Sequence, residues 1–333
     1  MLHQRHRIAL ASLVTLGTFF ASGCHGSDSG STEPKPYKDD TPTHPAGIIV
    51  SSRFVGARPY AAAVTPSGRM LVGLLDDGFV VTEVFPDTGF LQGMAVGSVP
   101  TDIGLNAAGD LGFVANQYDD NIQEFSTSVG QSLRLIPVTG DPFSVVSDAS
   151  GSTIYVTTNT NFLYKINVAT SAVQAQLNTD GNAAQSLTFS PVSGLLYVST
   201  RDGGTVLEVN PPTLTVVRRF SPGNRTQEVA VTKDGRELWI ANEGGFVTVV
   251  TLATGASTNL LVGGQLWGLA ISPDQQQVWV GSLNEGVVKV INRSAKTLGA
   301  PIAVGGRPRR IRFSPFGARA VVANEAGYIS VIK

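Results

Sequence analysis

The residues of this chain that could do chemistry are arginines, carboxylates and aromatic rings, because histidine and cysteine are confined to its start. The histidines and the single cysteine are His3, His6, His25, His44 and Cys24. From residue 48 onward the sequence therefore excludes Ser–His–Asp and Cys–His nucleophilic pairs. It also excludes a zinc, copper or haem site with histidine ligands. We expect no cofactor and no metal.

Arginines, acids and aromatics recur at one place in a repeat of about 40 residues. A position often occupied by proline is followed by two residues that change from copy to copy. The first of the two is Tyr60, Thr101, Phe143, Gln185, Gln227, Trp267 or Arg309. The second is Ala61, Asp102, Ser144, Ser186, Glu228, Gly268 or Arg310. Arg58, Arg225 and Arg307 precede three of these pairs.

Arginine forks and aromatic faces suit an anionic or peptide ligand. The predicted ligand site consists of Arg58, Tyr60, Asp102, Phe143, Gln185, Arg225, Glu228, Trp267, Arg307, Arg309 and Arg310. The alternative is that these side chains face solvent and pair with one another. Arg310, Glu228 and Asp102 are also the groups that a lactone hydrolase without histidine would use for acid–base chemistry, although no spacing specifies that activity.

Two further sets of charges have simpler explanations. Acids recur at expected hairpin turns, namely Asp76, Asp77, Asp119, Asp120, Asp202, Glu243, Glu285 and Glu325. Such acids usually serve the turn, and a calcium site is the alternative, although the chain has no Asp-x-Asp-x-Asp string. The one basic cluster, RPRRIR at 307–312, could contact phosphate or nucleic acid. Ion pairs with Glu325 and its neighbours, or a local ligand contact, fit better.

The elements that must position these residues are seven copies of one unit. Equivalent turn positions are Pro66, Ala107, Ala149, Pro191, Lys233, Pro273 and Pro315, with steps of 41, 42, 42, 42, 40 and 42 residues. Six residues past each marker lie Val72, Phe113, Tyr155, Tyr197, Trp239, Trp279 and Val321. Each unit shows the period-two alternation of β-strands, with Asn, Asp and Gly at the hairpin turns.

Four strands in a unit of this length predict one blade of a β-propeller. We therefore predict an all-β protein, a seven-bladed propeller of four-stranded antiparallel blades over residues 48–333. The last copy stops after three strands, and an isolated strand at about 48–55 precedes the first copy. Because open sheet edges invite aggregation, we expect this N-terminal strand to complete the last blade and close the ring.

The units also resemble a known family. The tetrapeptides at 113–116 (FVAN), 155–158 (YVTT), 197–200 (YVST) and 239–242 (WIAN) are similar to the Tyr-Val-Thr-Asn repeat. The segments Val304-Gly305…Pro308 and 314–317 (SPFG) match the surrounding consensus of the YVTN (YncE-like) propellers. The resemblance covers residues 48–333 and implies the propeller fold. It does not imply one activity, since the family includes binding proteins and putative hydrolases.

Residues 1–23 have the organisation of a secretory signal. Arg5 and Arg7 precede a 13-residue apolar run from Ile8 to Phe20, and three small residues come before Cys24. The run is too short for a comfortable membrane span. The pattern resembles a bacterial lipoprotein signal, in which the cysteine is lipidated and becomes the first residue. Ordinary cleavage that leaves Cys24 as a free thiol is the alternative, and an exposed thiol is a liability outside the cytosol.

The segment 24–47 has almost no apolar residue after Cys24 and is rich in Ser, Gly, Pro and Asp, so we expect a disordered tether. His25, rather than aspartate, follows the cysteine, and resemblance to enterobacterial sorting then favours the outer membrane. From Cys24 onward the chain has 22 basic and 25 acidic residues, a net charge of −3, which argues against a nucleic-acid partner.

The sequence favours an exported, lipid-anchored and non-catalytic binding module. Its expected partner is an envelope protein, a peptide or a small anionic ligand. A lactonase-like hydrolase and an accessory protein of periplasmic redox or metal metabolism are the alternatives, and no cofactor ligand supports the latter.

Overall fold

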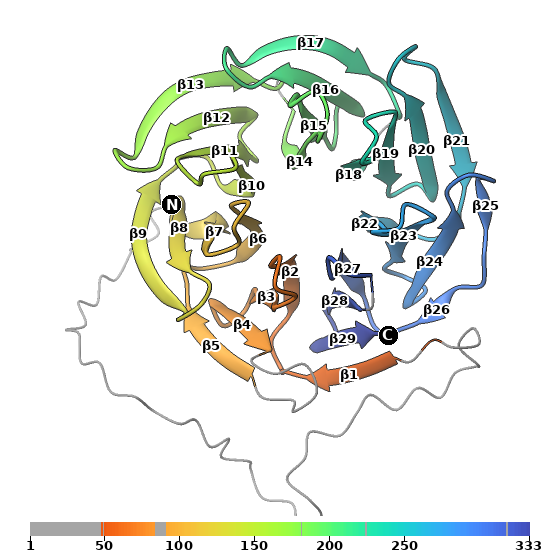
Figure 1. The fold of residues 1–333 in the computed structure, drawn as a ribbon, viewed down its shortest axis with the longest axis horizontal. Coiled ribbons are helices and arrows are strands. Elements are labelled where there is room, and N and C mark those ends of the chain that lie inside the picture. The colour runs from red at the N-terminus through yellow and green to blue at the C-terminus, as the bar shows by residue number, and fades with distance from the viewer. Residues whose placement is uncertain (1–47, 49, 84–90, 181, 224, 318) are drawn as a thin grey trace, which may run out of the picture. The chain divides into compact units, whose positions relative to one another are not determined.

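The computed structural model describes residue 48 and residues 50–333, except 84–90, 181, 224 and 318. The expected signal (1–23), the tether (24–47) and the lipidation site Cys24 lie outside the described residues. Within the described part, the chain forms seven antiparallel sheets arranged as a ring around a central channel (Figure 1). No helix in this part is long and apolar enough to cross a membrane.

Each sheet is one blade, and its strands run outward from the channel in chain order, except that the outermost strand of blade 7 is the first strand of the described residues. Blade 1 contains β2 (Pro59–Val64), β3 (Met70–Leu74), β4 (Phe79–Glu83) and β5 (Leu91–Ala95). Blade 2 contains β6 (Pro100–Leu105), β7 (Leu111–Asn116), β8 (Asn121–Ser126) and β9 (Gln131–Pro137), with a single 3-10 turn η1 (Gln117–Asp119) before β8. Blade 3 contains β10 (Pro142–Ser147), β11 (Thr153–Thr158), β12 (Phe162–Asn167) and β13 (Ala172–Asn178).

The remaining blades repeat this order. Blade 4 contains β14 (Ala184–Phe189), β15 (Leu196–Thr200), β16 (Thr205–Asn210) and β17 (Thr215–Phe220). Blade 5 contains β18 (Thr226–Val231), β19 (Glu237–Asn242), β20 (Phe246–Thr251) and β21 (Ser257–Leu261). Blade 6 contains β22 (Leu266–Ile271), β23 (Gln277–Ser282), β24 (Val287–Asn292), β25 (Thr297–Leu298) and β26 (Ile302–Ala303). Blade 7 contains β27 (Pro308–Phe313), β28 (Ala320–Asn324), β29 (Tyr328–Ile332) and β1 (Val50–Phe54).

Blade 6 departs from the regular pattern in its outer strand. The sequence places the fourth strand near residues 302–304, but two short strands, β25 and β26, both pair with β24. The interruption contains Pro301, which has no N–H to donate to the ladder.

The ring closes as predicted. β1 pairs antiparallel with β29 from Val50↔Ile332 to Phe54↔Tyr328. The hydroxyls of Ser52 and Ser330 lie 2.8 Å apart, and the N–H of Val55 continues the ladder to the carbonyl of Gly327 at 2.8 Å. Of the predicted strand 48–55, residue 49 lies outside the described residues.

The aromatic position of the repeat fills the spaces between blades. Trp239 of blade 5 is fully buried and packs with Leu269 and Val278 of blade 6. Tyr197 of blade 4 likewise packs against Val229 and Ile240 of blade 5. Because a sheet buries its hydrophobic face against the next sheet, these contacts form the core of the ring.

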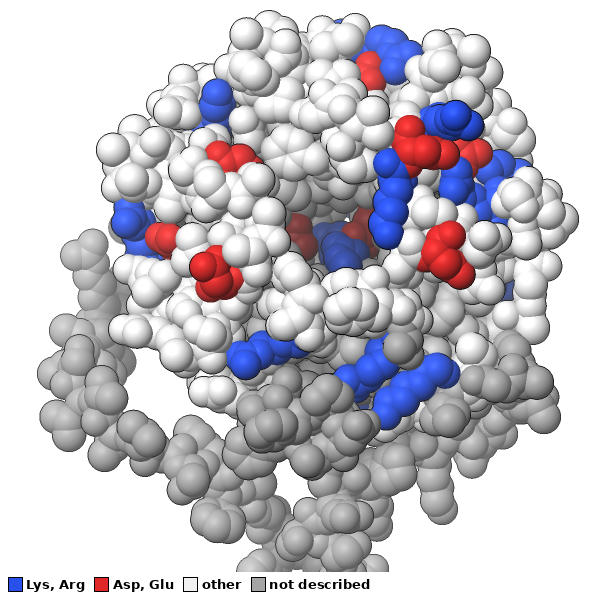
Figure 2. All heavy atoms as spheres, in the orientation of Figure 1, with Lys and Arg blue, Asp and Glu red and all other residues white. Residues whose placement is uncertain are grey.

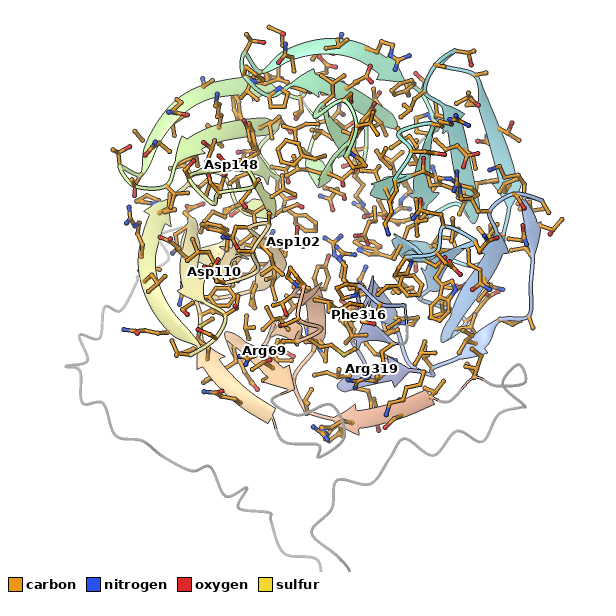
Figure 3. All side chains as sticks on the ribbon, in the orientation of Figure 1. Arg69, Asp102, Asp110, Asp148, Phe316 and Arg319 are labelled. Carbon is orange, nitrogen blue, oxygen red and sulfur yellow. The ribbon has the colours of Figure 1, made fainter. Side chains whose placement is uncertain are left out.

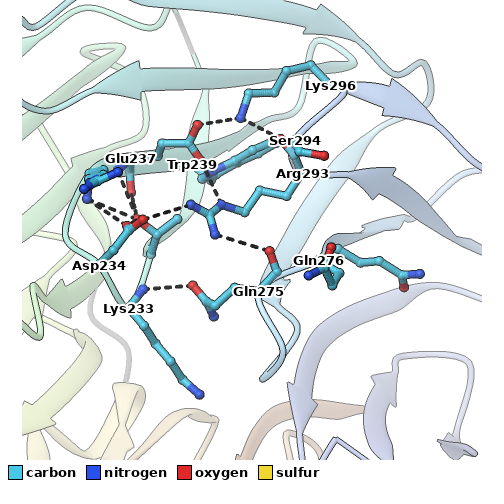
Figure 4. Close-up of polar contacts among 12 residues, drawn as sticks. Lys233, Asp234, Glu237, Trp239, Gln275, Gln276, Arg293, Ser294 and Lys296 are labelled. Atoms are coloured by element: carbon cyan, nitrogen blue, oxygen red, sulfur yellow. Dashed lines mark hydrogen bonds and ion pairs between the residues drawn. The ribbon is translucent and has the colours of Figure 1, made fainter.

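Charged groups bridge blades 5 and 6 over the same indole. The carboxylate of Glu237 accepts hydrogen bonds from Lys296 at 2.5 Å and from Arg293 Nε at 2.9 Å (Figure 4). Lys296 also lies 4.5 Å above the ring of Trp239. Burial alone would raise the pKa of Glu237, but the hydrogen bonds from Lys296 and Arg293 outweigh burial and lower it.

Candidate functional site

The ring of variable residues is created by a β-bulge at the start of every inner strand. In blades 1–4 and 7 one residue is skipped in the pairing of the first two strands, and in blades 5 and 6 two residues are skipped. The skipped residues are Tyr60, Thr101, Phe143, Gln185, Gln227–Glu228, Trp267–Gly268 and Arg309. A bulge re-aims side chains and recurs at barrel rims and next to active sites, so each blade turns these residues toward the same end of the channel.

The bulge residues lie on the side of the ring that carries the turns between strands 2 and 3, which we name the loop face. The opposite side, with the turns between strands 1 and 2, is the turn face. Several bulge residues pack together across the loop-face end of the channel. Tyr60 of blade 1 meets Phe143 of blade 3 edge-on, with ring centroids 6.3 Å apart. The guanidinium of Arg309 lies 3.8 Å above the ring of Trp267 and 5.2 Å from that of Tyr60.

This packing buries the aromatic residues of the predicted ligand site. Tyr60, Phe143 and Trp267 retain less than a tenth of their accessible surface and form one apolar cluster with Leu75 and Leu283. Burial raises the pKa of the Tyr60 hydroxyl. The aromatic residues therefore pack against one another at this end of the channel, whereas the alternative interpretation of the sequence had them facing solvent.

A shallow cavity of about 390 Å³ remains beside the aromatic cluster on the loop face. It is lined by Tyr60, Phe143, Asn159, Ala183, Gln185, Arg201, Asp202 and Trp267. Gln185 donates to the side-chain oxygen of Asn159 at 3.0 Å. Tyr60, Phe143, Gln185 and Trp267 were predicted from the sequence as ligand-site residues. Asn159, Arg201 and Asp202 belong to turns between strands 2 and 3, and Ala183 directly precedes β14.

The exposed loop-face arginines are paired with acids 18 positions further along the chain. The pairs are Arg58–Asp76 at 2.7 Å, Arg225–Glu243 at 3.1 Å and Arg307–Glu325 at 3.1 Å, between guanidinium nitrogen and carboxylate oxygen. The cause is the backbone: the N–H of Glu243 donates to the carbonyl of Arg225, and Glu325 repeats this bond to Arg307. Arg58, Arg225 and Arg307 thus lie on separate blades, each beside its own acid.

Glu243 is the most connected of these acids. One oxygen accepts from Arg201 at 2.8 Å and from the Gln227 amide, and the other lies 3.1 Å from Arg225 and 3.3 Å from Gln265. Burial would raise its pKa, but the hydrogen bond from Arg201 lowers it.

Two other hairpin acids bind the backbone of the neighbouring connections between blades. Asp119 accepts from the N–H of Ser98 at 2.8 Å, and Asp120 accepts from the N–H groups of Gly140 and Asp141. Glu285 instead pairs with Lys289 at 2.7 Å. Among the described residues, no group of three or more His, Cys, Asp or Glu is placed to hold a metal ion.

The second variable position of the repeat supplies three charged residues that lie together in the channel, namely Asp102, Glu228 and Arg310. The guanidinium of Arg310 is 2% exposed and lies 3.1 Å from Glu228 Oε1 and 4.0 Å from Asp102 Oδ1. Figure 3 places Asp102 on the channel wall, and Figure 2 shows basic atoms between acidic atoms at the centre of the channel. Burial would lower the pKa of Arg310, but the charges of Glu228 and Asp102 outweigh burial and raise it.

The contacts of this group extend over five blades. Glu228 Oε1 also pairs with Arg312 at 2.6 Å, and Glu228 Oε2 accepts from the N–H of Leu269 at 3.0 Å. Asp102 Oδ2 accepts from the hydroxyl of Ser144 and from the N–H of Val145. The basic cluster 307–312 is thus engaged in internal ion pairs, including Arg309 Nε at 2.7 Å from Glu325 Oε1.

Comparison with known proteins supports the architecture and no particular activity. The sequence matches no protein-family model, and no curated protein is significantly similar to it. A chain of the hydrazine synthase of Kuenenia stuttgartiensis superposes with a TM-score of 0.77 and 17% identity, covering 84% of this chain and 95% of that one. This chain is a seven-bladed β-propeller. Because 1847 chains of solved structures match it, the likeness shows a fold that many functions share.

Proposed function

We propose that this protein is a non-catalytic binding module of the YVTN (YncE-like) type that presents its loop face to an envelope protein, a peptide or a small anionic ligand. The observation that carries this proposal is the ring of seven bulges, which turns the variable residues of every blade toward one end of the channel. The shallow cavity beside Phe143 and Gln185 offers aromatic walls and amide groups at the same end.

We propose a non-catalytic role because the channel carboxylates, Glu228 and Asp102, are already engaged in ion pairs and hydrogen bonds. Both oxygens of Glu228 and one oxygen of Asp102 are already bound by cations or N–H and O–H donors. A general base needs a lone pair directed at the substrate, and such paired carboxylates serve structure first.

We also propose that the propeller is held at the cell envelope through lipidated Cys24, which becomes the first residue after removal of 1–23, with 24–47 as a tether to the outer membrane. The test is replacement of Cys24 by serine. The variant should move from the membrane fraction to the soluble periplasmic fraction and lose incorporation of labelled palmitate. A serine variant that stays in the membrane fraction would contradict lipid anchoring.

The loop-face proposal is tested by affinity capture of the full-length protein from its native envelope. A triple variant with Arg58, Arg225 and Arg307 changed to Gln removes three exposed charges. The buried acids Glu243 and Glu325 keep their ion pairs with Arg201 and Arg309. The matched control is Arg219→Gln, which breaks the comparably exposed Arg219–Asp180 pair on the outer strand of blade 4. Partners lost from the triple variant and kept by the control support the proposal; partners kept by both contradict it.

A second candidate, hydrolysis of a small lactone, is favoured by one observation: Asp102, Glu228 and Arg310 converge from blades 2, 5 and 7 at a single place. Turnover of a lactone panel by the purified protein, abolished by Glu228→Gln with the fold intact, would establish it. Absence of turnover across the panel would remove it. For an accessory role in redox or metal metabolism, the described residues offer no supporting observation.

A further inference from the structure

The channel contains a second cavity that the loop-face proposal does not use. It has a volume of about 470 Å³ and lies between the ring of Asp102, Glu228 and Arg310 and the turn face. The inner strands of all seven blades line it, and Arg312 is the fourth charged residue in its wall. Figure 2 looks down the channel and shows both basic and acidic atoms in the central hollow. The cavity is therefore open to solvent at this end, and Arg312 is its most exposed charged side chain, at 29%.

One side of this cavity is cationic. Glu228 shares a single oxygen, Oε1, between Arg310 and Arg312, at 3.1 and 2.6 Å. Two guanidinium groups and one carboxylate leave one positive charge in excess. Arg310 Nε is buried and has no hydrogen-bond acceptor among the described residues. Because a buried donor without an acceptor is costly, this side favours an added carboxylate, which matches the guanidinium fork.

The other side is anionic. Asp102 uses Oδ2 to accept from Ser144 and Val145. Its Oδ1 lies 4.0 Å from the nearest guanidinium nitrogen, that of Arg310, which is beyond hydrogen-bonding distance. A buried carboxylate oxygen whose ion pair is this long favours a closer donor such as an ammonium group.

We propose that the channel binds a free α-amino acid, with its carboxylate at Arg310 and Arg312 and its ammonium group at Asp102. A simple anion would meet the charges of Asp102 and Glu228, and a simple cation would meet two arginines, so a zwitterion fits both sides. Toward the turn face the cavity is lined by Leu105, Val146 and Phe189, which suit an apolar side chain. The volume falls in the range of small-molecule pockets.

The experiment is calorimetric titration of the purified full-length protein with three matched probes. Leucine carries both charged groups, 4-methylpentanoate lacks the ammonium group, and isoamylamine lacks the carboxylate. Each deletion removes a charge-assisted hydrogen bond, so each analogue should bind at least roughly tenfold more weakly than leucine. No binding by leucine or by any other standard amino acid would overturn the proposal, and so would equal affinity for leucine and 4-methylpentanoate.

Asp102→Asn is the matched variant, because asparagine keeps the shape and one side-chain oxygen. It should weaken leucine binding roughly tenfold and should strengthen binding of 4-methylpentanoate, because the variant removes a negative charge that repels the anion. An equal loss for both probes would contradict the assigned role of Asp102. If this variant fails to fold, the comparison of the three probes on the native protein still decides. The loop-face triple variant separates the two proposals, since it should keep full leucine affinity even if it loses its partners.

Discussion

Arg310 and Glu228 lie 3.1 Å apart although their blades, the seventh and the fifth, are not neighbours in the ring. Their side chains meet because each is the second residue after the first paired residue of its inner strand, Pro308 in blade 7 and Thr226 in blade 5. The pair is nearly inaccessible, and Glu228 also bonds to the backbone of blade 6. The channel is therefore held by charges that cross it as well as by apolar contacts between adjacent blades.

We expect Glu228→Gln to lower the free energy of unfolding by about 3–5 kcal/mol, because it leaves the buried Arg310 without its main counter-charge. Urea unfolding followed by circular dichroism measures the change. Adding Arg310→Met to the same variant should restore part of the loss, since an apolar side chain removes the unpaired charge. Asp180→Asn, at the exposed pair with Arg219, is the control and should change stability by about 1 kcal/mol or less. Equal effects of the two single variants would contradict the role assigned to Glu228.

Trp239→Ala should destabilise the protein by about 3–5 kcal/mol, because the fully buried indole fills the space between blades 5 and 6. Phe316→Ala is the matched control, since Phe316 is 82% exposed at a turn and its removal should change stability by about 0.5 kcal/mol or less. Thermal and urea unfolding would measure both. A small effect at Trp239 would show that the blades do not depend on this position.

The sequence predicted the ring of seven and the place of the variable residues because both follow from a strict repeat. One residue per unit, such as Tyr60 or Trp267, stands at the bulge, and the repeat spacing alone locates it. The same spacing predicted closure, because an unpaired strand at the start matched a missing strand at the end.

The repeat pattern could not predict which side chains at the variable positions contact one another. Tyr60 and Phe143 meet across two blades, a contact that depends on the angle between sheets and on the size of intervening side chains. Ion pairs of the basic cluster with Glu325 were expected, but the pairs Arg58–Asp76 and Arg225–Glu243 were missed. They repeat the 18-residue offset of Arg307 and Glu325, so counting that offset in the other units would have found them. The interrupted outer strand of blade 6 reflects Pro301, whose effect on the ladder outweighs the strand pattern around it.

The stability contributed by Glu237 should depend on pH. Its pKa is lower in the folded state than in the unfolded chain, so its contribution is fully present above the unfolded-state pKa of about 4.3. The contribution is lost as the pH falls through the lower folded-state value. Urea midpoints of the native protein and of Glu237→Gln should therefore differ most near neutral pH and converge in acid. A difference that stays constant with pH would show that Glu237 stabilises the blade interface without its charge.

Removal of residues 1–55 should open the ring, whereas removal of 1–47 should leave it closed. The longer truncation deletes β1, whose five residues all pair with β29, and it exposes an unpaired edge that can recruit another chain. We expect the longer truncation to self-associate in size-exclusion chromatography and to melt roughly 5 °C or more below the shorter one, because a loss of about 2 kcal/mol shifts the Tm of a large domain by several degrees. A synthetic peptide of residues 48–55 should restore the monomer. If both truncations remain equally stable monomers, the contact between the first and last strands does not close the ring in solution.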